Sequence, residues 1–192
     1  MKPMKTFFAI VILVALSATL MAGNDRDRDL RVGGIRAGYQ GSGLFLGNDM
    51  YPASEAYPSF YAGFFRDTRI FSVLHFGSGA EYFQNGLQFT PDNRRVLHYI
   101  SLPLDLKLKL GPIFALGGMA PSFKVAEREF INGYGEKPPS GDRSRGFDAP
   151  VFVGAGLKIW FLTLEARYHW GLLDVYDGYY NRYLQIGAGI SF

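Results

Sequence analysis

The sequence predicts an all-β protein, an eight-stranded antiparallel up-and-down transmembrane β-barrel. Short segments alternate between apolar and polar residues with a period of two, which is the pattern of a strand with two different faces. Long and short connections between these segments also alternate along the chain. The composition, with 24 glycines and 16% aromatic residues among 192 residues, is typical of such barrels.

The N-terminal residues predict export. Lys2 and Lys5 precede the apolar run 7–16, and small residues lead from there to Ala22. An uncleaved anchor helix is the alternative, but polar Ser17 ends the run short of the ~20 residues that span a bilayer. We therefore expect a cleaved signal peptide (1–22), a charged periplasmic tail (23–29) and an outer-membrane β-barrel (30–192).

Composition also limits the classes of partner and site. The chain has no cysteine, so it is neither a disulfide scaffold nor a lipoprotein anchored through cysteine. Its formal net charge of +3 falls further when the signal is removed, which does not favour nucleic-acid binding. The tail sequence GNDRDRD lacks the full calcium-loop pattern. We expect no metal and no cofactor.

The strands are expected in order along the chain, separated by connections of two kinds. Tight turns are expected near 66–68, at Gly111-Pro112 and near 158–161, and the other connections are long. Antiparallel strands that cross a bilayer, with long loops on one side and short turns on the other, produce this alternation. Both termini then lie on the periplasmic side. The expected strands are 30–40, 57–66, 69–83, 97–110, 112–126, 147–158, 160–171 and 182–192.

The two faces of these strands differ in charge. In segment 100–110 every even position is Ile or Leu, whereas Asp105, Lys107 and Lys109 lie on the odd face. A basic residue that faces lipid at mid-bilayer costs roughly 2–4 kcal/mol, so the charged face is expected to line the lumen. The expected lumen charge network consists of Arg36, Glu81, Asp105, Lys107, Glu165 and Arg167.

An eight-stranded barrel is only wide enough for side chains to fill it. We therefore expect these charges to pair and to plug the lumen, because an unpaired buried charge costs about 3–5 kcal/mol. A narrow ion channel or a proton relay is the alternative. By the same logic of faces, arginine at lipid-facing Ile186 should impair folding far more than arginine at lumen-facing Gln185.

The C-terminal segment YLQIGAGISF resembles the β-signal of outer-membrane proteins, in which a terminal aromatic residue and alternate apolar residues are recognised by the barrel-assembly machinery. The matching residues are Leu184, Ile186, Ile190 and Phe192. The segments GSGAEYFQNG, YISLPLDLKLKLG, GAGLKI, LEARYHWGL and NRYLQIGAG are similar to the PorT-like, porin-family outer-membrane β-barrel domain. This resemblance implies an eight-stranded barrel in the bacterial outer membrane. One branch of that family is linked to a secretion apparatus, but no residue here singles out that branch.

The function expected from these features is structural or interactive. The insert 127–146 is polar, rich in Gly and Pro and mixed in charge, so it is either a solvated loop or a site for an extracellular ligand or envelope partner. An enzyme acting on lipids at the barrel rim is a further alternative, with candidate residues His98, Tyr99, His169, Asp174 and Asp177. No spacing among them marks a catalytic triad, so we predict no catalytic residue and no enzyme.

Overall fold

The computed structural model describes residues 31–46, 49–50, 55–88, 90, 92–132, 134–136, 144–176 and 178–192. The expected signal peptide (1–22), the expected tail (23–29) and Asp177 lie outside the described residues. Within the described part of the chain, no helix is long and apolar enough to cross a membrane.

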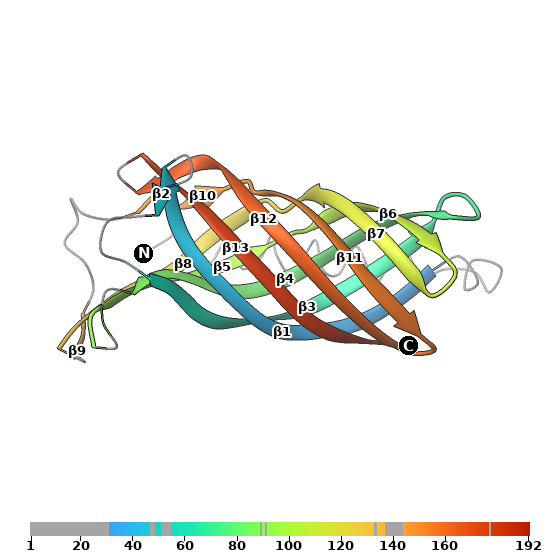
Figure 1. Ribbon diagram of the computed structural model, residues 1–192, viewed down its shortest axis with the longest axis horizontal. Coiled ribbons are helices and arrows are strands. Elements are labelled where there is room, and N and C mark those ends of the chain that lie inside the picture. Colours follow the sequence, from blue (N-terminus) through green and yellow to red (C-terminus); the bar gives the residue numbers. More distant parts are fainter. Residues whose placement is uncertain are drawn as a thin grey trace, which may run out of the picture. The chain divides into compact units, whose positions relative to one another are not determined.

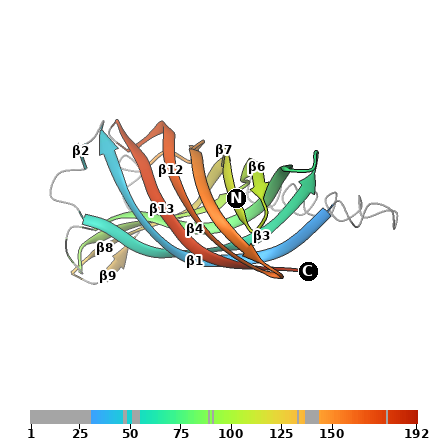
Figure 2. The same cartoon turned by 45° about the vertical axis from the view of Figure 1, so that its right-hand side comes forward.

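The described chain is built from β-strands that wind obliquely around a common axis (Figures 1 and 2). The strands are β1 (Arg31–Leu46), β2 (Asp49–Met50), β3 (Glu55–Arg69), β4 (Leu74–Gln88), β5 (Arg94–Ser101), β6 (Leu104–Leu110), β7 (Ile113–Met119), β8 (Ser122–Ile131), β9 (Tyr134–Glu136), β10 (Phe147–Asp148), β11 (Val151–Ile159), β12 (Leu162–Tyr176) and β13 (Tyr179–Ser191).

The sheet closes on itself as a ring of eight strands. Its order is β1, β3, β4, β6, β7, β11, β12 and β13, and β13 pairs with β1 to complete the circle. Every pairing whose register is described is antiparallel. Closure removes the open strand edges that hydrocarbon cannot satisfy. The predicted eight-stranded antiparallel barrel is therefore confirmed.

At three of the eight positions around the ring, the strand is interrupted by a short break and a second strand continues beyond it. The breaks separate β5 from β6, β8 from β7 and β10 from β11, and they contain Pro103, Pro121 and Pro150. Proline has no N–H for the strand ladder, so the regular pairing stops there. The breaks lie on neighbouring strands, since Leu102 N donates to Pro121 O (2.9 Å) and Ala120 N donates to Pro150 O (2.8 Å). Each strand therefore continues in line after its proline.

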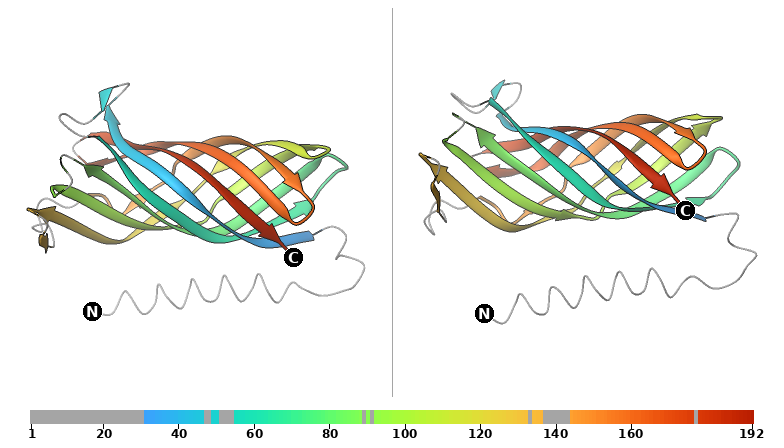
Figure 3. Two further views of the ribbon diagram at one scale, coloured as in Figure 1. Left: turned by 60° about the horizontal axis from the view of Figure 1, so that its bottom comes forward. Right: turned by 90° about the horizontal axis from the view of Figure 1, so that it is seen from below.

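Tight turns and the C-terminus gather at one end of the barrel, which we call the short-turn end (Figure 3). The turn Gly111-Pro112 joins β6 to β7, and Gly111 has a φ of 65°, which glycine adopts without strain. Trp160-Phe161 joins β11 to β12. The predicted turn at 66–68 is wrong: β3 runs to Arg69, and residues 70–73 make the turn.

At the opposite end, the loop end, the strands are longer than predicted. β1 extends to Leu46 rather than to 40, and β12 extends to Tyr176 rather than to 171. The predicted long loop at 172–181 is instead a hairpin whose turn includes Gly178. The alternation of polarity stops there because the inward-facing residues Leu44 and Val175 are themselves apolar and buried, although backbone pairing continues. For this reason the pattern alone underestimates the strands at this end.

The exterior of the ring is apolar and the interior holds the charges. Leu104, Leu106, Leu108 and Leu110 are all exposed, whereas Asp105 and Lys107 between them are buried. Strand β13 shows the same arrangement, since outward-facing Ile186 is 51% exposed and inward-facing Gln185 is 1% exposed. A water-soluble barrel has the opposite arrangement, so this exterior fits hydrocarbon. Trp160, Phe161 and Phe192 are exposed at the short-turn end, where an aromatic girdle meets the membrane interface.

Candidate functional site

A four-residue ion network crosses the middle of the lumen. Glu81 on β4 accepts hydrogen bonds from Arg36 Nε on β1 and from Arg167 Nη2 on β12, the latter at 2.8 Å. Glu165 Oε1 lies 3.2 Å from Arg36 Nη1 and 3.1 Å from Arg167 Nε. The two acids and two bases therefore alternate, and all four side chains are buried. Each charge has two partners of opposite sign, which offsets the cost of its burial.

A second charge cluster lies toward the short-turn end. Asp67 on β3 accepts hydrogen bonds from Lys107 Nζ at 3.0 and 3.1 Å and from Lys109 Nζ at 2.9 Å. The Lys107 ammonium also lies 4.9 Å from the centre of the Phe114 ring, within the range of a cation–π contact. These contacts hold Lys107 in the lumen.

All six predicted network residues are buried, but they do not form one network. Arg36, Glu81, Glu165 and Arg167 lie together, whereas Lys107 pairs with Asp67 in the second cluster. The sixth residue, Asp105, belongs to neither, and its Oδ1 has no hydrogen-bond partner in the described part of the chain. A Cβ at Gly77, the β4 residue opposite Asp105, would come within 2.4 Å of that oxygen. Asp105 thus occupies a recess that a glycine leaves open.

Sequence reasoning missed Asp67, because it assigned that residue to a turn. Asp67 lies on the same face of β3 as Tyr61, which is buried in the lumen. Extending the alternation from Tyr61 to residue 67 would have placed Asp67 in the lumen as well. The sequence also offered no reason to expect so many aromatic side chains in the lumen. They share the inward face with the charged residues, and only the register of distant strands brings their rings together.

An aromatic column continues from the ion network toward the loop end. The ring of His169 stacks between Phe152 and Tyr183, with ring centroids 4.7 and 4.2 Å away. Phe83 follows, 5.2 Å from Tyr183 and 5.3 Å from Tyr99. Stacked rings at these separations are favourable contacts beyond their burial alone.

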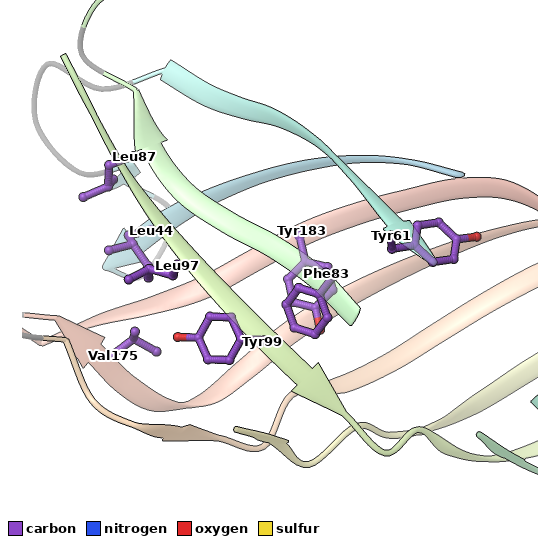
Figure 4. Close-up of a cluster of buried hydrophobic side chains, with 8 residues drawn as sticks. All are labelled: Leu44, Tyr61, Phe83, Leu87, Leu97, Tyr99, Val175 and Tyr183. Atoms are coloured by element: carbon purple, nitrogen blue, oxygen red, sulfur yellow. The ribbon is translucent and has the colours of Figure 1, made fainter. Parts of the chain in front are cut away.

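An apolar layer follows the aromatic column at the loop end. Figure 4 shows four aliphatic side chains grouped on one side of the rings, with Tyr61 at the far side. All belong to one buried cluster. The four side chains of this apolar layer are Leu44, Leu87, Leu97 and Val175.

A cavity remains near the short-turn end of the lumen. Only about 10 Å³ of it is available to the centre of a water molecule, which is roughly the space that one water needs. Its lining comes from strands all around the ring and carries more basic than acidic groups. The lining residues are Arg36, Phe65, Asp67, Lys107, Lys109, Phe114, Lys158, Thr163, Glu165 and Gly189.

Residues 144–146, where the long insert 127–146 ends, are held at the loop end by hydrogen bonds and ion pairs. Lys124 Nζ donates to the backbone oxygen and the hydroxyl of Ser144, and it also pairs with Glu127. Arg145 N donates to Val175 O at 2.7 Å, and Arg145 forms an ion pair with Asp174 at 2.8 Å. Residues 144–146 are therefore tied to β8 and β12.

The residues considered for catalysis are separated in the structure. His98 Nδ1 lies 2.6 Å from the Tyr82 hydroxyl, and His169 is buried in the aromatic column. No hydrogen bond within the described residues joins either histidine to a serine or to a carboxylate. Asp174 pairs with Arg145 instead. Among the described residues, no group of three His, Asp or Glu side chains is arranged to hold a metal ion.

This chain shares its fold with solved structures, among them the following two. Ail, the attachment invasion locus protein of Yersinia pestis, in complex with the heparin analogue sucrose octasulfate, aligns with a TM-score of 0.53 and 14% identity. The alignment covers 85% of this chain and 99% of Ail. Neisserial surface protein A aligns with a TM-score of 0.54 and 15% identity, over 84% of this chain and 97% of that protein.

No protein-family model matches the sequence, and no curated protein matches it. The PorT-like assignment therefore stays a prediction, whereas the fold is that of small outer-membrane barrels. A closed ring with a hydrocarbon-compatible exterior is a structure that can span a bilayer. The protein thus has the fold and the apolar exterior of an integral outer-membrane β-barrel.

Proposed function

We propose that the protein is a structural and interaction protein of the outer membrane, with a lumen closed by its own side chains and a loop end that binds a partner. The observation that carries this proposal is the filling of the lumen along its length. A filled lumen leaves the loop end as the part of the barrel best suited to act on other molecules.

Closure of the lumen is supported at three successive levels. Four buried aliphatic side chains form the apolar layer, and the aromatic column fills the space beneath it. The ion network then ties β1, β4 and β12 together across the lumen. A permeating ion would have to displace paired charges, which is costly in a low-dielectric interior. These features favour a plug over the narrow channel.

Conductance is the direct test of closure. The refolded protein in planar bilayers is expected to give no stable unitary currents, and Arg167→Ala is expected to lower stability without opening a pore. Stable currents from the wild-type barrel would contradict a closed lumen. Leu97→Ser places a polar group in the apolar layer, so the conductance of this variant tests that layer separately.

The loop end offers a braced β-hairpin, β8–β9, which extends beyond the ring (Figure 3). Tyr134 is 78% exposed and Ile131 is also exposed, so apolar surface is presented to water. The Arg94 guanidinium lies 4.5 Å from the centre of the Phe130 ring, and Asn132 N donates to Asn93 Oδ1 at 2.8 Å. Binding residues commonly lie on connections held by a rigid scaffold.

The chemistry of this hairpin favours a protein partner. Ail was solved with a sulfated heparin analogue, but here two basic side chains at the loop end are paired with carboxylates. Arg95 contacts Glu129 at 3.3 Å, and Arg145 contacts Asp174 at 2.8 Å. Paired charges beside exposed aromatic and aliphatic groups suit a protein surface better than a polyanion. Because neither histidine considered for catalysis has an acid or a serine partner among the described residues, we propose no enzymatic role.

Site-specific photocrosslinking in cells tests this interaction role. A crosslinker at Tyr134 is expected to give a discrete protein adduct, because that side chain projects from the hairpin. The matched control carries the crosslinker at Leu106 in the lipid-facing band, where no such adduct is expected. If Tyr134 yields only the adducts seen at Leu106, the loop end is not an interaction site.

A further inference from the structure

We propose that the short-turn mouth of the lumen is a binding site for a small oxyanion with phosphate chemistry, held between Lys109 and Lys158. Both side chains line the cavity described above, on β6 and β11. This site lies at the end of the barrel opposite the loop end and borders the ion network through Arg36 and Glu165, and it does not depend on the interaction role proposed above.

The charge balance of the cavity favours an anion. Among its lining residues, four are basic and two are acidic. Glu165 is engaged by two arginines, and both oxygens of Asp67 are engaged by lysines. When buried Asp105, Glu81 and Arg167 are added to the lining residues, this set still holds five bases and four acids. Excess positive charge between low-dielectric walls raises the local concentration of anions.

The free donors lie toward the mouth. Lys109 uses one of its ammonium protons on Asp67, and the Lys158 ammonium makes no hydrogen bond or ion pair with the part of the chain that the structure describes. Lysine carries three donors, so both groups retain capacity. On the paired strand β12, Thr163 lies directly opposite Lys158, and its hydroxyl side chain also lines the cavity.

Exposure limits where the ligand can sit. The Lys107 side chain is 3% exposed, whereas the Lys109 side chain is 17% exposed, so access increases from the network toward the mouth. The cavity beneath has space for roughly one water, so a larger ion must remain at the mouth. A tetrahedral oxyanion there can accept hydrogen bonds from two ammonium groups that approach from different strands.

The test uses the refolded chain in maltoside micelles, which contain no phosphate, with inorganic phosphate titrated at constant ionic strength against chloride. Backbone amide NMR signals of Thr163 and Gly189 are expected to shift and to saturate. Lys158→Gln should weaken binding roughly ten-fold or more, because it removes a charge-assisted hydrogen bond. Lys158→Arg should preserve binding, and Arg128→Gln, which removes one exposed positive charge at the loop end, should have no effect.

Phosphate on a lipid headgroup is a second source of the same chemistry. In phospholipid nanodiscs, added phosphate should still shift the two amide signals if the site takes the free ion, and should have no effect if headgroups already fill it. Shifts in micelles that never saturate, or that persist unchanged in Lys158→Gln, would mean an adventitious ion only and would overturn the proposal. Lys158 makes no ion pair within the described residues, so this variant is expected to fold even if Lys109→Gln does not.

Discussion

Arg167 shows how a single residue links the layers of the lumen. Its guanidinium pairs with Glu81 and Glu165 and also lies 5.2 Å from the centre of the Tyr61 ring. The side chain is 1% exposed. It therefore connects the ion network to the aromatic side chains, and its removal affects both.

Replacement of Arg167 by methionine is expected to lower the free energy of unfolding by about 3–5 kcal/mol, because it leaves buried carboxylates with one partner in place of two. Urea titration of the refolded barrel in micelles measures the change. The double variant Glu81→Gln/Arg167→Met should recover part of the loss, since one unbalanced acid is removed with the base. A loss no larger than that of exposed Arg128→Ala would contradict the role of the network.

At the scale of the element, β13 combines two opposite environments. Its outward positions, Leu184, Ile186 and Ile190, face the exterior, and its inward position Gln185 donates from Nε2 to Gln40 Oε1 at 2.7 Å. Gln185 also lies opposite Arg167 on the paired strand β12. Gln185→Arg is therefore a poor control for Ile186→Arg, because a second cation beside Arg167 would enter a packed interior.

A better control for the lipid face lies on the same strand at the loop end. Ile186→Arg is expected to cost roughly 2–4 kcal/mol of folding free energy at the middle of the strand, whereas Tyr180→Arg should cost about 0–1 kcal/mol near the interface. Urea-dependent folding into phospholipid vesicles compares the two variants. Equal costs would mean that Ile186 does not face hydrocarbon.

At the scale of the whole molecule, Phe192 allows the stability of the folded barrel to be distinguished from its assembly into the membrane. Phe192 N donates to Gly33 O at 2.9 Å and so contributes to ring closure through its backbone. Its side chain, however, is 84% exposed. The Phe192 side chain therefore contributes little to the stability of the closed barrel. The resemblance to the β-signal nevertheless predicts that the barrel-assembly machinery recognises this side chain.

Phe192→Ala is expected to change the unfolding free energy in micelles by less than about 0.5 kcal/mol, as for other exposed side chains. The same variant should insert more slowly into liposomes that contain the assembly machinery. A gel shift between unheated and boiled samples measures folding in both experiments. Equal insertion rates for the wild type and the variant would remove Phe192 from the proposed signal, and a large loss of stability would give it a structural role instead.

The local pattern of the sequence was sufficient for the fold. Period-two alternation and the parity of loop lengths predicted eight strands, their order and the lipid-facing stripe, as on residues 104–110. These features are local because every residue in a membrane strand faces either lipid or lumen. The same pattern failed at residues 66–68, where the strand continues to Arg69, and at the loop end, where apolar Leu44 and Val175 occupy the inward face.

Only the tertiary structure decided which lumen residues meet. Arg36 contacts Glu81, 45 residues away, and Glu165, 129 residues away, whereas Asp105 remains outside the network. Those contacts depend on the register of paired strands around the closed ring, and a shift of one residue would turn every side chain to the other face. Alternation assigns a residue to the lumen, but ring closure and register determine its partners.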